Sequence, residues 1–365
     1  MNANTRKLFG TIHLWMGLLV GIPAAILGVT GILLMLVHPL PAEVGASIPP
    51  AIDRTLALAR TAAPEGAVAQ QFAPPEAAGQ PATVRFAVPR TSENPRGFVA
   101  VEIDPATDTI VPPAPPAAAG LWMQIMHDLH GNLMVGGREG RQVVGYVGIA
   151  MTLMGVTGIV IWWPKPRKWR EAFTVKTTGT TRRLLHDLHG AAGIWGLIVF
   201  VIVSVTGVLI AFPIGGAPGG GPRQRAVEEV PPAFELHVDA AVAAAAAKTP
   251  GMGLIDVAMP RGPTDTYRIR MAPAGTERSA PPFIVTVRAD ASTVESVRDP
   301  ASAPFNERLR AWNRALHMGM GLGWIWWILV AVSGVLPVLF AITGTWLWLI
   351  KRRSKVPIAQ QEPAQ

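Results

Sequence analysis

Cysteine is absent from the chain of 365 residues, and charged residues are scarce, at 15% of the total. The missing cysteine excludes disulfides, iron–sulfur clusters, thiolate zinc sites and covalent attachment of haem through a C-x-x-C-H motif. A soluble domain usually has about a quarter charged residues, whereas 50% of this sequence is hydrophobic and its mean hydropathy is +0.32. This apolar content excludes disorder over most of the length.

Four long apolar runs without any charged side chain predict membrane-spanning helices, namely 14–37, 143–163, 191–214 and 322–350. About 20 helical residues cross a hydrocarbon core of roughly 30 Å, and a single helix, unlike a single strand, satisfies its own backbone hydrogen bonds in lipid. Pro23 and Pro337 are expected to kink the first and the fourth helix. The first run is too long for a signal peptide and has a poor cleavage site after it, so we expect it to be retained.

The distribution of lysine and arginine predicts the orientation of these helices. The loop 164–185 carries seven basic residues and one acidic residue, whereas the segment 39–120 has five basic and eight acidic residues. Residues 213–316 are nearly balanced, with twelve basic and eleven acidic residues. Because cytoplasmic loops are enriched in lysine and arginine, we expect the 164–185 loop and both termini to be cytoplasmic. The formal net charge of +8 is then a signal of topology, and nucleic acid is not an expected partner.

The expected fold class is an all-α bundle of four transmembrane helices with two small periplasmic α+β lobes. In each lobe, a short helical stretch precedes two alternating, strand-like runs. The predicted helices are 53–63 and 239–249, and the predicted strands are 83–88, 98–103, 266–271 and 283–288. Segments rich in proline or glycine predict linkers at 112–116 and 215–222. The lobes can alternatively be read as simple spacers.

The expected parts follow one another as helix, lobe and helix, twice over. In chain order they are helix 1 (1–38), periplasmic lobe 1 (39–120), an amphipathic segment with helix 2 (121–163), the basic cytoplasmic loop (164–185), helix 3 (186–214), periplasmic lobe 2 (215–310), helix 4 (311–350) and a cytoplasmic tail (351–365).

An internal repeat supports this duplication. The sequence His-Asp-Leu-His-Gly occurs at 127–131 and again at 186–190. Four histidines also stand at matching distances before four Thr-Gly pairs. The separations are 18 residues from His13 to Gly31 and from His189 to Gly207, 28 from His130 to Gly158, and 27 from His317 to Gly344. The chain therefore reads as a duplicated unit with one histidine at or just ahead of the start of each membrane helix.

The predicted topology sorts these histidines into two pairs. His13 and His189 fall at the cytoplasmic ends of helices 1 and 3, and His130 and His317 fall at the outer ends of helices 2 and 4. Two histidines on facing helices provide the axial ligands of six-coordinate haem iron, and a membrane interior supplies apolar walls for the porphyrin. We therefore predict two b-type haems with these four residues as iron ligands. The simpler alternative is that interfacial histidines contact water or lipid headgroups.

Other residues near these histidines have expected roles of their own. His127 and His186 lie one helical turn earlier, where each is predicted to contact a haem propionate or to replace its neighbour as ligand. Asp128 and Asp187 are candidates to orient an imidazole. The Thr-Gly pairs are most simply explained as positions where helices approach closely. No side chain is predicted to act as a catalytic residue.

The motifs together resemble the PepSY-associated transmembrane family. The resemblance rests on the four-helix layout with Thr-Gly pairs, the Leu-His-x-x-x-Gly helix starts, the Trp-Trp-Pro-Lys sequence at 162–165 and the two helix-plus-strand lobes. It covers about residues 6–353. Family members similar to this chain include inner-membrane ferric-siderophore reductases that carry two b-type haems. The resemblance implies that the four helix-start histidines bind haem and that the lobes are PepSY domains. It also implies that the chain lies in the inner (cytoplasmic) membrane of a bacterium.

The expected function is that of a haem-dependent oxidoreductase, which conducts electrons across the membrane and reduces a ferric siderophore in the periplasm so that iron is released. The expected partners are the ferric siderophore, membrane lipid and an electron donor such as quinol or a separate reductase. Two alternatives remain open, a membrane-anchored PepSY module that regulates a protease and a transporter for iron or a siderophore. Neither alternative requires haem, so the haem content separates them from the reductase.

Overall fold

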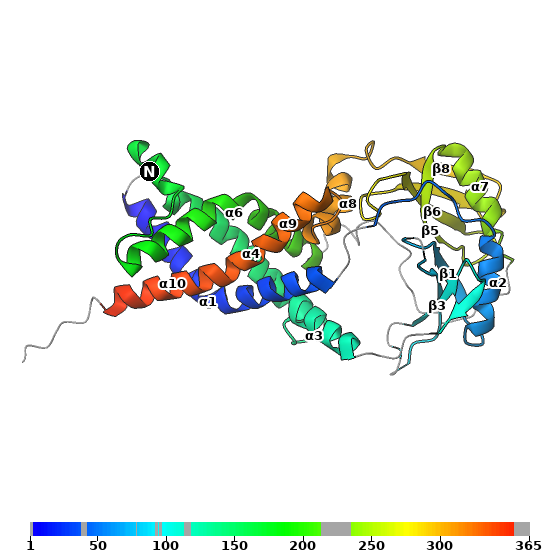
Figure 1. The fold of residues 1–365 in the computed structure, drawn as a ribbon, viewed down its shortest axis with the longest axis horizontal. Coiled ribbons are helices and arrows are strands. Elements are labelled where there is room, and N and C mark those ends of the chain that lie inside the picture. The colour runs from blue at the N-terminus through cyan, green and yellow to red at the C-terminus, as the bar shows by residue number, and fades with distance from the viewer. Residues whose placement is uncertain are drawn as a thin grey trace, which may run out of the picture.

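The computed structural model describes residues 3–37, 42–77, 79–91, 94, 97–112, 118–212 and 235–353. The molecule is elongated, with a helical bundle at one end and a sheet domain at the other (Figure 1). The N-terminus lies at the end of the bundle away from the sheet domain. Apart from Pro112, the linkers predicted at 112–116 and 215–222 lie outside the described residues.

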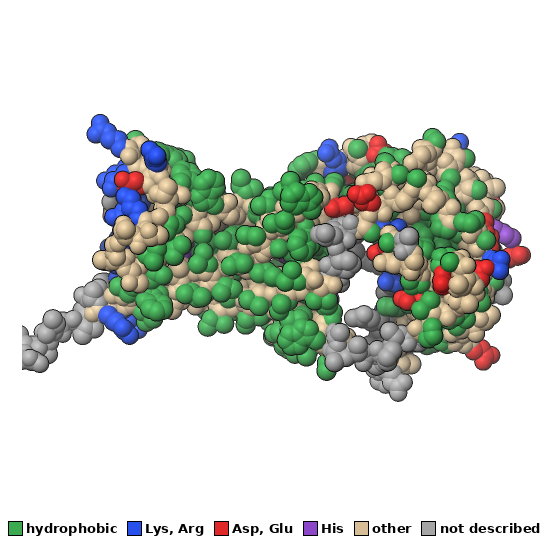
Figure 2. Space-filling view, viewed as in Figure 1, with side chains coloured by type: hydrophobic (Ala, Val, Ile, Leu, Met, Phe, Trp, Pro, Cys, Tyr) green, Lys and Arg blue, Asp and Glu red, His purple; other side chains and the backbone are tan. Residues whose placement is uncertain are grey.

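Four helical segments of the described chain are long and apolar enough to cross a membrane. They are α1 (Ala3–Val37), α4 (Gly137–Trp162), α6 (Thr181–Ala211) and the consecutive helices α9 (Gly323–Ser333) and α10 (Val335–Arg353). Helix α1 packs against α4 and α10, and α6 packs against the same two helices, so α1 and α6 occupy opposite corners. Large apolar side chains such as Leu19 and Trp195 are exposed. Figure 2 shows hydrophobic side chains over much of the visible face of the bundle, as contact with lipid requires.

The fourth span is interrupted at Gly334, three residues before Pro337. The proline ring clashes with the carbonyl four residues earlier, which belongs to Ser333, the last residue of α9. The other expected kink does not interrupt its helix, because α1 continues through Pro23. At the interruption, Gly334 packs against Gly28 of α1, where an added Cβ on Gly28 would lie 2.3 Å from the Gly334 carbonyl oxygen. Only glycine permits this approach.

Two shorter helices precede the spans α4 and α9. They are α3 (Ala118–Asn132) and α8 (Phe305–His317), and they lie at the end of the bundle nearest the sheet domain (Figure 1). Each is separated from the following span by glycines with positive φ, which break the helix: Gly136, Gly137, Gly319 and Gly321. The sequence analysis placed His130 and His317 at or just ahead of the outer ends of the spans, and the structure places them on these separate helices.

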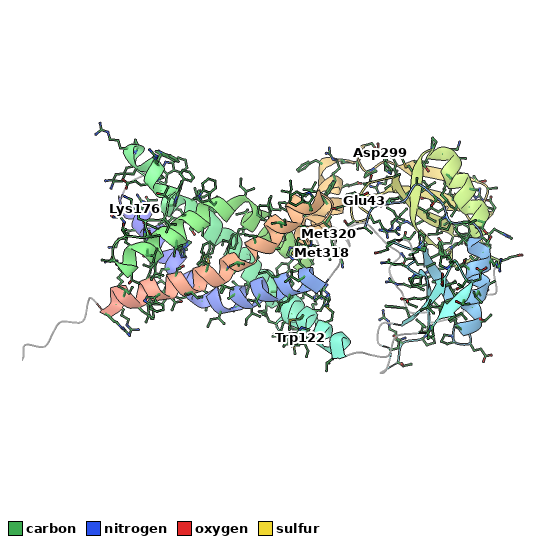
Figure 3. The ribbon with its side chains drawn as sticks, viewed as in Figure 1. Glu43, Trp122, Lys176, Asp299, Met318 and Met320 are labelled. Carbon is green, nitrogen blue, oxygen red and sulfur yellow. The ribbon has the colours of Figure 1, made fainter. Side chains whose placement is uncertain are left out.

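Basic residues gather at the opposite end of the bundle (Figure 2). The connection between α4 and α6 lies there, with the short helices η1 (Pro166–Lys168) and α5 (Trp169–Ala172). Figure 3 shows Lys176 at this end and Met318 and Met320, in the turn after α8, at the other. The two ends of the bundle therefore differ in charge as the sequence predicted.

The soluble part of the chain forms one antiparallel sheet of eight strands in the order β4-β3-β2-β1-β5-β6-β7-β8. The strands are β1 (Val68–Ala73), β2 (Ala82–Ala87), β3 (Phe98–Asp104), β4 (Thr109–Val111), β5 (Met252–Ala258), β6 (Thr266–Pro273), β7 (Phe283–Arg288) and β8 (Val294–Arg298). Strands β1 and β5 join the two halves through Gln71 opposite Ala258 and Phe72 opposite Val257. The label all-α therefore describes the bundle but is imprecise for the whole chain, and the two predicted lobes form one continuous sheet.

Helices α2 (Ile52–Ala62) and α7 (Val238–Lys248) pack against the sheet and enclose its core. Each helix is capped by an aspartate of the other. The Asp239 carboxylate accepts hydrogen bonds from the N–H groups of Ile52 and Asp53, at 2.7 and 3.1 Å. The Asp53 carboxylate accepts from those of Val238 and Asp239, at 2.8 and 3.3 Å. The exchange satisfies unpaired N–H groups at both helix starts and ties the two halves together.

The sheet domain contacts the bundle through Glu277, in the loop between β6 and β7. Its carboxylate accepts hydrogen bonds from the backbone N–H groups of Gly321 and Gly323 at the start of α9. A negative charge at this position also complements the helix dipole. An ion pair between Arg298 of β8 and Glu307 of α8 adds a second contact. These contacts hold the sheet domain close to the helix that carries His317.

Candidate functional site

The structure brings the four predicted histidines together in two pairs. The ring centroids of His13 on α1 and His189 on α6 lie 6.2 Å apart. Those of His130 on α3 and His317 on α8 lie 6.1 Å apart. We name the first pair the far pair and the second pair the near pair, according to their distance from the sheet domain. Each pair takes one histidine from each half of the duplicated chain.

Each imidazole is fixed at Nδ1 by a threonine of a Thr-Gly pair. The Nδ1–Oγ1 distances are 2.9 Å for His13 and Thr157, 2.7 Å for His189 and Thr343, 3.1 Å for His130 and Thr30, and 3.2 Å for His317 and Thr206. All four threonines are buried. The same contact therefore recurs at every one of the four histidines.

The glycine of each Thr-Gly pair faces the same imidazole ring. An added Cβ would lie 3.1 Å from Cε1 of His130 at Gly31 and 3.0 Å from Cε1 of His317 at Gly207. In the far pair, the corresponding distances are 3.6 Å at Gly158 and 3.7 Å at Gly344. The interpretation of these glycines as helix-contact positions is therefore incomplete, because they make room for histidine rings. Close helix contact is instead served by other glycines such as Gly28 and Gly334.

The two additional histidines stay outside both pairs. His186 is 80% exposed, and its Nδ1 lies 3.5 Å from the carboxylate of Asp187. His127 is exposed, and its Nδ1 lies 2.9 Å from the carbonyl oxygen of Met123 in the same helix. The predicted orienting aspartates also make other contacts: Asp128 with Asn132, and Asp187 with Arg183. Threonines take the place next to the paired histidines that was expected for these aspartates.

The near pair is held as neutral imidazole. Burial, followed by the nearby His317, lowers the pKa of His130 to about 4. Burial also lowers the pKa of His317. Both rings are therefore unprotonated at neutral pH, so each keeps one nitrogen lone pair that can bind a metal ion.

Two phenylalanines that the sequence analysis did not single out extend from the far pair into the bundle. The ring of Phe340 lies 4.9 Å from that of His189, and Phe200 lies 6.0 Å from Phe340. They come from α10 and α6, so they line one interior side of the bundle. No short motif marks them, because apolar side chains are common throughout these helices.

A bundle of four apolar spans with two interior histidine pairs, attached to an antiparallel sheet domain, defines a multi-pass membrane protein. The chain belongs to the PepSY-associated TM family, since it matches the PepSY-associated TM region over residues 11–351. It is also 27% identical over 281 residues to an uncharacterized protein of Pseudomonas aeruginosa, PA4219. That match covers 65% of this chain and 66% of the relative, just under two thirds of its length.

Proposed function

We propose that this protein is an electron conduit of the bacterial inner membrane, which holds two b-type haems and reduces a ferric siderophore on the periplasmic side. His13 and His189 of the far pair would ligate one haem, and His130 and His317 of the near pair would ligate the other. When bound, the haems would supply one-electron transfer between the two faces of the membrane.

The separation of the paired rings carries this proposal. A bond between a metal ion and an imidazole nitrogen is about 2.0–2.1 Å long, and this nitrogen lies about 1 Å from the ring centre. Two imidazoles that held one metal ion between them would therefore have their centroids about 6 Å apart, and the separations in the structure are 6.2 and 6.1 Å. Aromatic rings that merely pack also lie about 4.5–7 Å apart, so a visible spectrum has to decide between these interpretations.

The surroundings of the pairs support the same assignment. The four paired histidines are partly buried among apolar helices, and apolar walls suit a porphyrin. Threonine contacts hold every ring at Nδ1 and leave the other nitrogen for a ligand bond. Ligands from facing helices of a bundle are a common arrangement for bound cofactors.

The substrate would be iron bound by a siderophore. Hard oxygen ligands hold Fe(III) more tightly than Fe(II), so the transfer of one electron to the iron weakens the chelate and releases Fe(II). The electron would come from quinol or a separate reductase on the cytoplasmic side. Arginines around the near end of the bundle would attract an anionic chelate or haem propionates, namely Arg138, Arg141, Arg308, Arg310 and Arg314.

The first experiment is a visible spectrum of protein purified after expression with sufficient haem. We expect the Soret, α and β bands of low-spin b-type haem, at two haems per chain, all extractable by acid acetone. His13→Ala and His189→Ala should each remove one haem, and His130→Ala and His317→Ala the other. His127→Ala and His186→Ala are the matched controls and should keep both. A colourless wild-type protein would refute the proposal.

The second experiment tests the substrate. Protein reduced with dithionite and freed of excess reductant is mixed with ferric hydroxamate, catecholate or carboxylate chelates, and Fe(II) is trapped with ferrozine. At least one chelate should reoxidise the haem with formation of Fe(II). His130→Ala and His317→Ala should abolish this step while the far haem stays reducible. If no chelate reoxidises the protein, the substrate assignment is wrong.

A second candidate function is a membrane-anchored module that binds and regulates a protease. The edge strand β8 favours it, because Glu295 to Arg298 are exposed and β7 is its sole partner strand among the described residues. An exposed edge can accept a strand of another protein. Capture of a periplasmic protease by a protein that lacks haem would favour this candidate.

A further inference from the structure

We propose that Thr30, Thr157, Thr206 and Thr343 are positioning residues that hold the four paired histidines in the tautomer with hydrogen on Nδ1. The inference rests on the proposed function only for the identity of the bound metal, haem iron. The tautomer itself follows from the hydrogen bonds of the polypeptide. It leaves Nε2, with its lone pair, as the ligand atom of every histidine.

The direction of each His–Thr hydrogen bond follows from a second contact of the threonine. Every one of these hydroxyls also lies within hydrogen-bond distance of the carbonyl oxygen four residues earlier in its own helix. The partners and distances are Ile26 at 2.7 Å from Thr30, Leu153 at 2.9 Å from Thr157, Ile202 at 2.7 Å from Thr206, and Leu339 at 2.6 Å from Thr343. A carbonyl oxygen only accepts, so the single hydroxyl hydrogen is used there. The threonine oxygen must then accept from Nδ1–H.

An independent contact gives the same tautomer at the near pair. Nδ1 of His130 lies 3.0 Å from the Leu27 carbonyl oxygen, and Nδ1 of His317 lies 3.0 Å from that of Val203. Since a carbonyl cannot donate, both nitrogens must carry a hydrogen. The threonine contacts of all four histidines likewise reach Nδ1 and not Nε2.

This tautomer matters for two reasons. Neutral imidazole in water mainly carries its hydrogen on Nε2, so a histidine without the threonine would present the wrong nitrogen. A ligand imidazole whose N–H donates to an oxygen is also more basic and fixed in orientation, and loss of such a partner typically lowers metal affinity by about 10–100-fold. The threonines therefore act through the histidines and would not touch the haem themselves.

The far pair gives the sharpest test, because Nδ1 of His189 has Thr343 as its acceptor, with no carbonyl at hydrogen-bond distance in the described chain. Thr343→Val keeps the side-chain shape and removes the acceptor, whereas Thr343→Ser keeps the acceptor. Thr206→Val is the matched near-pair variant, in which the Val203 carbonyl can still accept from His317.

The first readout uses haem-free full-length protein labelled with ¹⁵N-histidine. Nitrogen chemical shifts should show the Nδ1–H tautomer for four histidines in the wild type and in Thr343→Ser. Thr343→Val should lose one of these signals, and Thr206→Val should lose none. If Thr343→Val keeps all four, the inference is wrong. If Thr343→Val does not fold, Thr343→Ala, which also removes the acceptor, carries the same test at His189.

The second readout is titration with haemin and redox titration of the loaded protein. Thr343→Val should bind the far haem about 10–100-fold more weakly, with a higher midpoint potential, because a less basic imidazole stabilises ferric iron less. Thr343→Ser should match the wild type; equal losses in Val and Ser variants would indicate packing and overturn the inference. Wild-type protein that binds no haem but shows four Nδ1–H tautomers would refute the proposed function and leave this inference standing.

Discussion

Substitution of the four glycines that face the histidine rings should affect the two pairs differently. The change is Gly→Ala at Gly31 and Gly207 for the near pair and at Gly158 and Gly344 for the far pair. At the near pair the new methyl group would lie 3.0–3.1 Å from Cε1, whereas at the far pair it would lie 3.6–3.7 Å away. Carbon atoms in favourable contact lie about 3.5–4.0 Å apart. The near-pair rings must therefore move by several tenths of an ångström, and the far-pair rings need not move.

Two opposing free-energy effects decide whether each Gly→Ala variant is stabilised or destabilised. Replacing glycine with alanine inside a helix stabilises it by about 0.5–1 kcal/mol. Overpacking of a filled site costs about 1–3 kcal/mol. The near-pair variants should therefore be destabilised by about 1–2 kcal/mol, while the far-pair variants should be unchanged or stabilised by up to about 1 kcal/mol.

The assay measures haem content and thermal unfolding for all four variants beside the wild type. If the cost falls on the ligand geometry, Gly31→Ala and Gly207→Ala should weaken haem binding at the near pair by about 5–30-fold, since about 1.4 kcal/mol corresponds to a factor of ten. Gly158→Ala and Gly344→Ala should keep both haems. Equal losses at both pairs, or a loss confined to the far pair, would refute the argument from these distances.

Three further predictions concern the rest of the molecule. Asp53→Ala should speed amide hydrogen exchange in α7 (Val238–Lys248) more than in α2, because the Asp53 carboxylate caps α7 and the loss of a cap costs about 0.5–2 kcal/mol. A larger effect in α2 would contradict the exchange of caps. Gly28→Ala should lower the midpoint of thermal unfolding by several degrees, because the added Cβ would lie 2.3 Å from the Gly334 carbonyl oxygen. Gly21→Ala, whose Cβ would lie 3.6 Å from Ala341, should not lower it. Equal midpoints would show that α1 and the fourth span separate easily. Reporter domains fused after Pro166 or Arg353 should behave as cytoplasmic, and those inserted at Gly79 or Gly262 as periplasmic, and a cytoplasmic signal at Gly79 would reverse the orientation.

The membrane spans could be predicted because apolarity over about 20 residues is a property of a single segment. The ends of these helices could not be predicted in this way, because a helix can continue beyond the apolar run into polar sequence where a capping residue satisfies its first N–H groups. Helix α6 begins at Thr181, ten residues before the apolar run, where the Thr180 hydroxyl accepts a hydrogen bond from the Arg183 N–H at 3.3 Å. Helix α1 likewise begins at Ala3. Apolar length therefore predicts which segments span a membrane but not where their helices start.

The continuous sheet could not be predicted from alternation of polar and apolar residues. Strand β5 is buried along nearly its whole length, so it lacks the alternation that identified β2, β3, β6 and β7. Its pairing with β1 joins residues on opposite sides of two membrane helices in the sequence, and no local pattern encodes such a contact. The edge strands β4 and β8 are short and were missed as well.

The histidine pairs were predictable only because the chain repeats itself. A single interfacial histidine has no distinctive signal, but four at matched distances from Thr-Gly pairs predict equivalent roles. The same repeat contained the threonine partners, which were assigned to helix packing instead. The His–Thr contacts join residues 100 to 154 positions apart, so only the fold could show which threonine contacts which imidazole ring.

Contacts within each half of the chain and contacts between the two halves have different roles. Every histidine is held by a threonine of its own half: His13 and His130 by threonines before residue 164, and His189 and His317 by threonines after it. Each pair, in contrast, needs one ring from each half, as do the β1–β5 junction and the exchanged aspartate caps. One half can therefore orient its imidazoles but cannot form either histidine pair alone. Joining two such units in one chain completes both pairs at once, which is the geometry that two identical subunits related by a twofold axis would give.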